Sequence, residues 1–563
     1  MKRIKPNWRK PATLPESVQN SLASFSAPFQ SILYQRGCET ENDAISLLLP
    51  SPPRSLPSQQ LGHLDLASQI IMESINDNAK IAVYGDYDTD GISATALLTL
   101  ALRKINAEVI PFIPNRLEDG YGLNETAIDT LHKEGASLLI TVDNGIRSTR
   151  EVAYAKSLGM AVIVTDHHQP PDSLPDADAL LNPKIPGDPY PYKHLAGVGV
   201  AYKLAEKLSC DYPNLNPADY LDLVALGTIA DIVPLTGENR YLVKKGLAQI
   251  NQHSRQSLYS LIRTAGISGR TINAADISFQ IAPRINSSGR LENINHLLPL
   301  QLLLSTDHAS CGNLSQLLEI HNDRRKKISQ SMRERIESQL PSTEELPSIL
   351  VSMEPENDQG VAGIAAGYLT NKYYLPSIVG KIGPSTTTAS CRSIPEFDIV
   401  AALEKVSDLL LHYGGHPLAA GFTIANHRLS DFHDRISVQA DQSLADLERH
   451  PTLEIDAFVQ LSELDQSLFQ EISKLEPTGE GNPAPVFAAT KLSASDIRKI
   501  GQNGSHLKLN ITDGRYVFPA IGFGFGDLAN KLPSTFELAF HFTENEFRGS
   551  KEFQLQILDL RSC

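Results

Sequence analysis

The chain has 563 residues, of which 41% are hydrophobic and 20% are charged. This length predicts about three or four globular domains, and no apolar run reaches the roughly 20 residues that a membrane-spanning helix needs. The net charge of −15 argues against a nucleic-acid coat protein but leaves a nuclease possible, because nucleases gather acidic residues around metal ions. The N-terminus lacks the apolar segment of a secretory signal, and the five cysteines form no C-x-x-C pair, which favours a cytoplasmic protein.

The N-terminal half begins with a lead-in segment, residues 1–60, which includes a Pro/Ser-rich stretch and whose role the sequence leaves open. Residues 61–245 alternate strand and helix patterns and predict a doubly wound α/β domain around a parallel sheet. The strand candidates are "KIAVYG", "EVIPFIP", "SLLITV" and "AVIVT". Residues 246–345 are expected to form a helical connector, in which the basic stretch 321–335 is either a solvated helix face or a nucleic-acid contact.

The C-terminal half is expected to hold two further domains. Residues 346–445 predict a second, smaller α/β domain, and residues 446–563 change to short alternating strands. Those strand candidates are "HLKLNI", "YVFPAIGF", "ELAFHFT" and "FQLQILDL". Short strands separated by turns predict an OB-like β-barrel, a fold often used to bind single strands.

The first strand of the large α/β domain leads into "GDYDTDG", which places Asp86, Asp88 and Asp90 on alternate positions. This spacing opens an EF-hand loop, but the twelfth position is Leu97 rather than Glu, and a strand rather than a helix precedes it. An EF-hand is therefore excluded. Three carboxylates so close together repel one another unless a cation lies among them, so the turn is a candidate metal site.

Two later strands and one helix end in further candidate ligands. Asp143 follows the third strand, Asp166, His167 and His168 follow the fourth, and Asp231 ends the helical run "LDLVALGTIAD". Each alone could be an ordinary turn residue or helix end, but parallel strands gather their carboxyl ends into one crevice. Aspartate and histidine without cysteine suit Mn²⁺ or Mg²⁺, and several carboxylates can hold two ions about 4 Å apart.

The motifs "DYDTDG", "TVDNG", "TDHH" and "LGTIADIVPL", in this order, resemble the four motifs of the DHH phosphoesterase superfamily. Downstream, "APRINSSGR", "GVAGIAAGYL", "CRSIPEFDI", "YGGHPLAAGF" and "LEPTGEGNPAPVF" resemble the RecJ family of bacterial single-strand-specific exonucleases. The resemblance covers nearly all of the chain from about residue 60 onward. It implies a DHH domain at 61–245, a DHHA1-type domain at 346–445 and the OB-like barrel at 446–563.

The resemblance also implies roles for the residues of the crevice. The implied metal ligands are Asp88, Asp90, Asp143, His167 and Asp231, with Asp143 bridging two ions. Asp86, Asp166 and His168 are expected to support them by orienting ligands or the scissile phosphate. Some relatives have a histidine where this chain has Tyr84, which leaves the ligand set at the first metal open.

Phosphate and nucleic-acid binding is expected of a second group of residues. In "YGGH", Gly414 and Gly415 would let backbone N–H groups approach an anion and His416 would add a donor, although a glycine pair can also cap a helix. The companion candidates are Arg116, Asn286, Arg290, Arg392 and Ser393. Arginine suits bidentate phosphate recognition, whereas a structural salt bridge is the alternative for the arginine at position 116.

The resemblance implies a metal-dependent 5′→3′ exonuclease that degrades single-stranded DNA to mononucleotides in DNA repair and recombination. It implies a monomer that works beside a single-strand-binding protein and a helicase. The alternative is a DHH phosphodiesterase acting on short oligonucleotides or cyclic dinucleotides, but such relatives are usually shorter and lack the barrel. A catalytically silent replication scaffold is disfavoured, because all the metal-binding aspartates are present.

Overall fold

The computed structural model describes residues 5–50, 61–116, 122–253, 255–342, 345–445, 450–547 and 550–562. The chain forms two compact units. One comprises Pro52–Leu447 with Gly479–Gly481, and the other comprises Met1–Ser51, Glu448–Thr478 and Asn482–Cys563. The larger unit contains all the candidate site residues.

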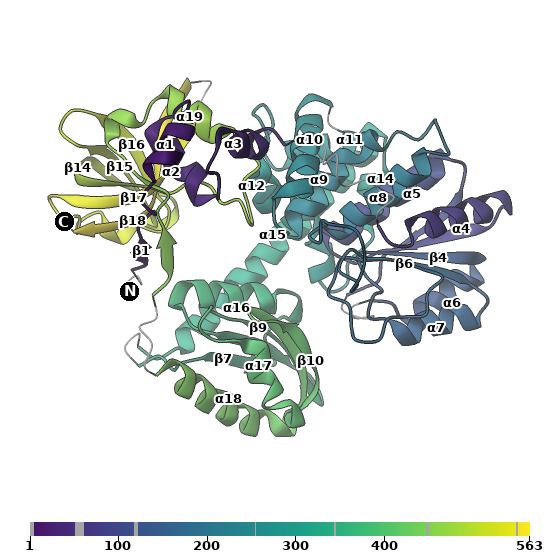
Figure 1. Ribbon diagram of the computed structural model, residues 1–563. Helices are drawn as coiled ribbons and strands as arrows, with labels where there is room; N and C mark the ends of the chain where they lie inside the picture. Colours follow the sequence, from purple (N-terminus) through teal and green to yellow (C-terminus); the bar gives the residue numbers. More distant parts are fainter. Residues whose placement is uncertain are drawn as a thin grey trace. The chain divides into compact units, whose positions relative to one another are not determined.

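A five-stranded parallel sheet forms the centre of the DHH domain (Figure 1). Its strands, in spatial order, are β3 (Glu108–Phe112), β2 (Lys80–Tyr84), β4 (Ala136–Val142), β5 (Ala161–Thr165) and β6 (Ala179–Leu181). The central strands are almost continuously apolar and buried, as strands covered on both faces must be. This architecture confirms the prediction of a doubly wound domain.

Helices cover both faces of this sheet. They are α4 (Leu64–Asn76), α5 (Thr89–Lys104), α6 (Glu125–Lys133), α7 (Thr149–Ser157), α8 (Gly197–Ser209), α9 (Leu221–Ala230) and α10 (Gly237–His253). Helices α6 and α7 pack on one face around a small core, whereas α4, α5, α8 and α9 contribute to the large core on the other. The crevice at the carboxyl ends of the strands therefore lies between two packed layers.

The connector is helical, as predicted. Its elements are α11 (Gln256–Thr264), α12 (Ala274–Asp276), a π-helical turn (Ile277–Ile281), α13 (Ala282–Ile285), α14 (Leu298–Leu304) and α15 (His308–Gln339). Near its start, α15 buries Cys311 and Leu318 in the core of the DHH domain. Near its end it buries Met332 and Ile336 against the first helix of the next domain. One continuous helix thus belongs to two cores.

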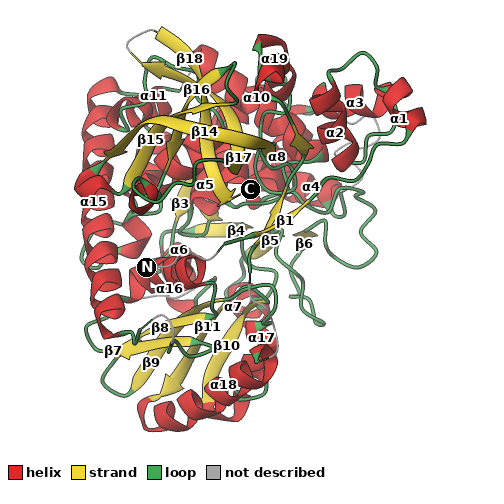
Figure 2. Ribbon diagram, turned by 90° about the vertical axis from the view of Figure 1, so that its left-hand side faces the viewer, coloured by secondary structure: helices red, strands yellow, loops and turns green. Residues whose placement is uncertain are grey.

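The DHHA1 domain is a mixed five-stranded sheet with helices on it (Figure 2). Its strands, in spatial order, are β10 (Leu410–His416), β11 (Ala419–Ala425), β9 (Thr386–Arg392), β8 (Ser377–Ile382) and β7 (Leu350–Glu354). Its helices are α16 (Gln359–Tyr373), α17 (Ile399–Glu404) and α18 (Leu429–Leu444). Only β7 and β8 pair in parallel, and β10 is an edge strand.

The smaller unit is a six-stranded OB-type sheet that closes through pairing of β14 with β17. Its strands, in spatial order, are β13 (Ala457–Phe458), β14 (Phe487–Ile500), β15 (His506–Thr512), β16 (Val517–Gly522), β18 (Ser550–Ser562) and β17 (Phe536–Phe547). Strands β15 to β18 lie where the sequence predicts them. Strand β14 is not among the predicted strands, because two bulges interrupt its alternation of apolar and polar residues.

The N-terminal segment belongs to the barrel unit. Its elements are β1 (Asn7–Arg9), α1 (Glu16–Ser21), α2 (Ala27–Gln35) and α3 (Glu41–Leu48), and β1 pairs with β12 (Thr452–Glu454). Phe29 of α2 is fully buried in the core that the helices share with the barrel. Trp8, the only tryptophan of the chain, donates a hydrogen bond from Nε1 to Asp559 Oδ2 (2.8 Å). Most of the predicted Pro/Ser-rich linker lies outside the described residues.

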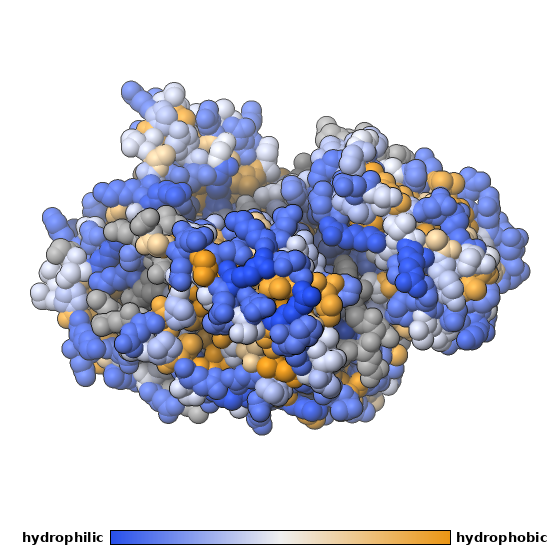
Figure 3. All heavy atoms as spheres, turned by 90° about the horizontal axis from the view of Figure 1, so that it is seen from below, coloured by the Kyte–Doolittle hydropathy of each residue, from blue (hydrophilic) through white to orange (hydrophobic). Residues whose placement is uncertain are grey.

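Hydrophilic residues cover most of the face seen in Figure 3, and hydrophobic residues occur there in small groups. No helix within the described ranges combines the length and the apolar composition needed to span a membrane.

We expect Phe29→Ala to destabilise the barrel unit by about 3–5 kcal/mol, because the change leaves a cavity in a shared core. Urea unfolding followed by tryptophan fluorescence reads this unit alone, since Trp8 is the only tryptophan. The matched control is Phe458→Ala, whose ring is 42% exposed and which should cost below about 1 kcal/mol. Equal midpoints for the two variants would show that the N-terminal helices do not stabilise the barrel.

Candidate metal centre and anion cavity

Three neighbouring strands of the DHH sheet deliver the metal-binding candidates. Strands β2, β4 and β5 are adjacent in the sheet although β3 lies between β2 and β4 in the sequence. The turn after β2 carries the aspartates at 86, 88 and 90, Asp143 follows β4, and Asp166 to His168 follow β5. Asp231 caps the end of α9. The crevice predicted from the motifs therefore exists, and all eight of these residues lie in it.

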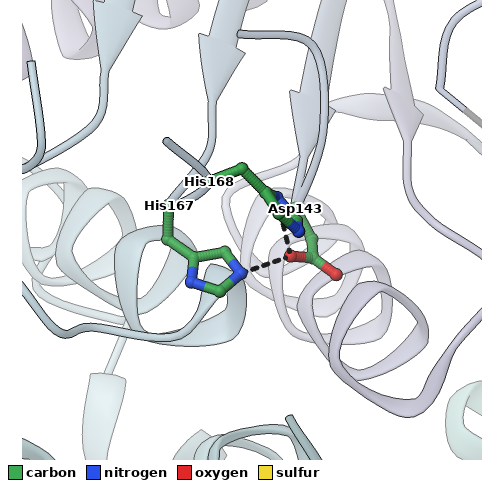
Figure 4. A group of neighbouring side chains, drawn as sticks. All are labelled: Asp143, His167 and His168. Atoms are coloured by element: carbon green, nitrogen blue, oxygen red, sulfur yellow. Dashed lines mark ion pairs between the residues drawn. The ribbon is translucent and has the colours of Figure 1, made fainter. Parts of the chain in front are cut away.

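The first group of donors consists of Asp90, His167 and Asp231, whose ligand atoms lie within 4.8 Å of one another. His167 Nε2 is 3.5 Å from Asp231 Oδ2 and 4.0 Å from Asp90 Oδ2. The same nitrogen is 3.1 Å from Asp143 Oδ1, and the neighbouring His168 ring approaches that oxygen from another side (Figure 4). The carboxylate of Asp143 therefore lies between the two imidazoles.

A second group consists of Asp86, Asp88 and Asp143, again with ligand atoms within 4.8 Å of one another. Asp143 also forms a third possible ligand group with His167 and His168, so it belongs to two of the three groups, which is the position that a bridging carboxylate needs. Asp86, expected from the resemblance to be a supporting residue, contributes one of the donor atoms here. Its Oδ1 is buried and has no hydrogen-bond partner among the described residues.

Several buried atoms of the crevice that could act as metal ligands form no hydrogen bond among the described residues, which indicates that the crevice fits cations. Asp143 Oδ1 and His167 Nε2 are also buried; they lie 3.1 Å apart, but neither forms a hydrogen bond of good geometry in the described part of the chain. Burial, reinforced by repulsion from neighbouring aspartates, raises the pKa of Asp86, Asp143 and Asp231 well above the ordinary value. The same causes raise the pKa of Asp90 to about 7. Hard oxygen donors with one imidazole suit Mn²⁺ or Mg²⁺, and a divalent cation would remove the repulsion.

Asp166 has a different environment from the other carboxylates. Its Oδ2 accepts from the Ile146 N–H (3.0 Å), while its Oδ1 accepts from the His167 N–H (2.7 Å), the His168 N–H (3.0 Å) and His168 Nδ1 (2.8 Å). Burial alone would raise the pKa of Asp166, but these hydrogen bonds lower it to about 2. Asp166 is therefore an ionised residue that orients the two histidines.

These surroundings shift the pKa values of the two histidines in opposite directions. Burial lowers the pKa of His167 to about 3, so its ring is neutral and able to bind a metal. Burial also opposes the charge on His168, but the hydrogen bond to Asp166 outweighs it and raises the pKa of His168.

Helix N-termini and small residues hold the aspartates in place. The Gly197 and Val198 N–H groups at the start of α8 donate to the two carboxylate oxygens of Asp90 (2.7 and 3.0 Å). A Cβ at Gly197 would come within 2.5 Å of Asp143 Cβ, and one at Gly227 within 2.6 Å of Asp90 Oδ1. Both glycines are therefore needed for the close approach of helices to the crevice.

Tyr84 faces away from this crevice. Its ring belongs to the core under α6 and α7, and its hydroxyl donates to the Gly122 carbonyl (3.0 Å) and accepts from Asn124 Nδ2 (3.2 Å). The residue that replaces the histidine of some relatives thus anchors a turn instead of completing the ligand set.

A cavity of about 770 Å³ opens beside the metal centre, between the DHH domain and the sheet of the DHHA1 domain. Asp166 and His168 line it from one side. Of the predicted phosphate-binding residues, those that line it are Arg116, Arg392, Gly414, Gly415 and His416. The two glycines lie on the exposed edge strand β10 rather than at a helix end, so the helix-cap alternative is wrong. Gly415 has a φ of 147°, and a Cβ there would come within 2.4 Å of the Ala419 carbonyl oxygen.

Three arginines concentrate positive charge at this cavity. Arg116 and Arg392 line it, whereas Arg290 does not line it and donates from Nη1 to the Gly360 carbonyl at the start of α16 (3.2 Å). Burial, reinforced by repulsion from Arg116 and Arg392, lowers the pKa of Arg290 to about 10. None of the three forms an ion pair with a carboxylate in the described ranges, so the salt-bridge alternative for Arg116 has no support there. Unpaired guanidinium groups beside a cavity favour an anionic ligand.

The remaining two candidates do not line the cavity. Asn286 accepts from the Thr89 hydroxyl (2.8 Å), which ties the connector to the first turn of α5 beside the metal centre. Ser393 donates to the Phe397 carbonyl (2.5 Å) in the loop after β9.

Other residues line the cavity without having been predicted, among them Tyr87 and Ser390. The sequence positions of both residues could have indicated that they lie near the site. Ser390 lies two positions before Arg392 on β9, so the two side chains share a face of the strand. Tyr87 lies between two metal-binding aspartates.

Three family profiles match the chain in the order of these domains. The DHH family, N-terminal domain, matches residues 80–228, the DHHA1 domain matches 346–442, and the RecJ OB domain matches 455–559. They confirm the predicted DHH, DHHA1 and OB-type folds.

Relatives align over nearly the whole chain. It is 35% identical over 534 residues to the single-stranded-DNA-specific exonuclease RecJ of Bacillus subtilis, an alignment that covers 94% of this chain and 67% of that protein. Crystal structures of Thermus thermophilus RecJ in complex with Mn²⁺ and with Mg²⁺ match with TM-scores of 0.83 and 0.78 at 31% and 29% identity. Each match covers 99% of this chain, with 80% and 78% of the respective structures. The chain therefore belongs to the RecJ family of single-stranded-DNA-specific exonucleases.

Proposed function

We propose that this exonuclease degrades single-stranded DNA from its 5′ end and releases mononucleotides, with two Mn²⁺ or Mg²⁺ ions at its active site. One observation carries the proposal: a single cavity of about 770 Å³ is lined both by His168 beside the metal centre and by a second set of residues. This second set, which we call the anion face, consists of Arg116, Arg392, Gly414, Gly415 and His416. A terminal nucleotide in this cavity would have its phosphodiester bond near the carboxylates and its terminal phosphate near the guanidinium groups.

The residues proposed to hold the ions are Asp88, Asp90, Asp143, His167 and Asp231, with Asp86 as a further candidate. Two groups of donors that share Asp143 support two ions rather than one. When bound, such ions supply a nucleophilic water at neutral pH and stabilise charge on the phosphate oxygens.

The protein's own groups are proposed to orient the scissile phosphate. The hydrogen bond to Asp166 favours the charged form of His168, and this ring, which lines the cavity, is proposed to donate a hydrogen bond to a phosphate oxygen there. The attacking oxygen would bond to phosphorus as the bond from phosphorus to the 3′ oxygen of the terminal nucleotide breaks, and a proton would pass to that 3′ oxygen.

The 5′ polarity is proposed from charge. A terminal phosphate carries up to about two negative charges near neutral pH, whereas a diester inside a strand carries one. Arg116, Arg392 and the edge strand with His416 form a face without carboxylate partners among the described residues, which favours the more highly charged group. A cavity of this size is in the range that encloses one small ligand, so a base-paired end would have to separate before entering.

The biological setting proposed from the family is DNA repair and recombination in the cytoplasm. A helicase would supply single strands and a single-strand-binding protein would present them to a monomeric enzyme. Release of a nucleotide from strands of any length separates this function from the alternative, in which only short oligonucleotides or cyclic dinucleotides are cut.

We expect Asp143→Asn to reduce degradation of a single-stranded DNA oligomer by at least about a thousandfold, because it removes the charge shared by both ligand groups. Asparagine tolerates the left-handed backbone at this position (φ 63°). In the unmodified enzyme a 5′ label should leave at once as mononucleotide while a 3′-labelled strand shortens gradually. Asp176→Asn, at a side chain that is 93% exposed, should change nothing. Survival of long strands while short fragments are cut would favour the phosphodiesterase alternative.

We expect Mn²⁺ affinity to weaken below about pH 7, roughly tenfold per pH unit for each displaced proton. The pKa of Asp90 is raised to about 7, so the metal-free folded protein holds protons that the unfolded chain would release at lower pH. Its stability therefore falls as the pH rises toward 7, and Mn²⁺ should restore it. Thermal unfolding at pH 6 and pH 8 should show the larger Mn²⁺ shift at pH 8. An equal shift at both values would contradict proton displacement.

We expect Arg392→Gln to raise KM for 5′-phosphorylated single strands roughly tenfold to a hundredfold, as the loss of a charged hydrogen bond predicts. Arg435→Gln is the matched control, because that guanidinium lies in the same domain but pairs with Asp408. Steady-state kinetics on strands with and without a 5′ phosphate measures the effect. An equal rise in KM for both substrates would argue against recognition of the terminal phosphate.

A further inference from the structure

Tyr87 lies where the metal centre meets the anion cavity. It stands between Asp86 and Asp88 in the sequence, and its half-buried ring lines the cavity. The guanidinium carbon of Arg116 lies 4.5 Å from the centre of this ring. That distance is typical of a cation–π contact, in which the negative face of the ring attracts the cation.

Arg116 needs such a contact. It lies near Arg290 and Arg392, whose positive charges repel it; Asp86 attracts it, but no carboxylate of the described ranges lies within ion-pair distance. An arginine side chain has many rotamers, so without an attractive surface it would move toward water. The ring holds the planar guanidinium in place without neutralising its charge, and its hydrogen-bond donors remain available for a ligand.

The ring itself is held by the surroundings of the metal centre. The Asp88 carboxylate accepts from the Asp90 and Gly91 N–H groups, which fixes the turn at the start of α5. On the connector side, Gly289 faces Tyr87, and a Cβ built at this glycine would come into ordinary van der Waals contact with Tyr87 Cδ2 (3.5 Å). Tyr87 is thus attached to the metal-binding turn and presents an aromatic surface to the cavity.

We propose that Tyr87 is a positioning residue that holds Arg116 over the cavity, and so fixes where the 5′ phosphate lies relative to the metal-binding aspartates. The inference rests on the proposed function, because it assumes that the cavity receives a terminal phosphate. In this proposal Tyr87 acts on the substrate only through Arg116. The proposal also gives a reason why an aromatic residue stands between Asp86 and Asp88.

The test compares kcat/KM for strands with a 5′ phosphate and with a 5′ hydroxyl in Mn²⁺. Tyr87→Leu should reduce the preference for the phosphorylated strand about fivefold or more, whereas Tyr87→Phe, which keeps the ring, should retain it. In an Arg116→Gln background, Tyr87→Leu should cause no further loss of preference. If Tyr87→Leu does not fold, Tyr87→Met serves the same purpose, and the thermal shift on Mn²⁺ binding reports that the neighbouring carboxylates are intact.

Each outcome is decisive. A preference that persists in Tyr87→Leu, or that falls by the same factor with and without Arg116, would overturn the positioning role. A preference lost equally in Tyr87→Phe would assign the effect to the hydroxyl and also overturn it. If the unmodified enzyme shows no preference for a 5′ phosphate, the proposed function of the cavity fails instead, before any variant is considered.

Discussion

Repulsion between buried carboxylates at the carboxyl edge of the parallel sheet is the interaction to which the rest of the larger unit is adapted. Two like charges about 4 Å apart cost about 4 kcal/mol even at an effective dielectric constant of 20. Here three groups of possible ligands each contain at least one aspartate, and within each group the ligand atoms lie within 4.8 Å of one another. Such a cluster is stable only with protons or cations among its members. The folded protein therefore needs protons or cations in this crevice to offset the repulsion between its carboxylates.

Backbone N–H groups around the crevice stabilise the aspartate carboxylates by donating hydrogen bonds to them. The start of α8 donates two N–H groups to Asp90, and the start of α5 is capped by Asp88. Glycines at the contact points allow both helices to approach the crevice. Asp166, in contrast, is saturated with hydrogen bonds and remains ionised. Chemically identical side chains thus take different roles according to the donors around them.

Much of this arrangement could be predicted from the sequence, because strands with apolar runs and acidic turns leave local signals. The four strand candidates of the DHH domain correspond to β2 to β5, and the aspartates and histidines after them meet in one crevice. What could not be predicted depends on interruptions of a pattern or on contacts between distant segments. In β14, Lys491 and Asp496 adopt positive φ at bulges and break the alternation of the strand. The orientation of Tyr84 depends on a turn some forty residues away.

The anion face also depends on contacts between distant segments, which the sequence does not reveal. Its members come from the DHH domain, β9 and β10, and no local pattern states that these segments line a common cavity. Motif resemblance identified Arg392 and the glycine pair, whereas Ser390 on the same strand face went unnoticed. Arg290 is not among the residues that line the cavity, and its part in binding stays a prediction. The roles of these residues remain predictions for the experiments described above.

Helix α15 has a mechanical consequence for substrate binding. Its 32 residues extend about 48 Å at 1.5 Å per residue, and its two ends are buried in the cores of the DHH and DHHA1 domains. The two walls of the cavity are therefore joined by a rigid strut rather than by a flexible hinge. For the proposed substrate, the distance across the cavity is therefore set by how one helix packs into both cores.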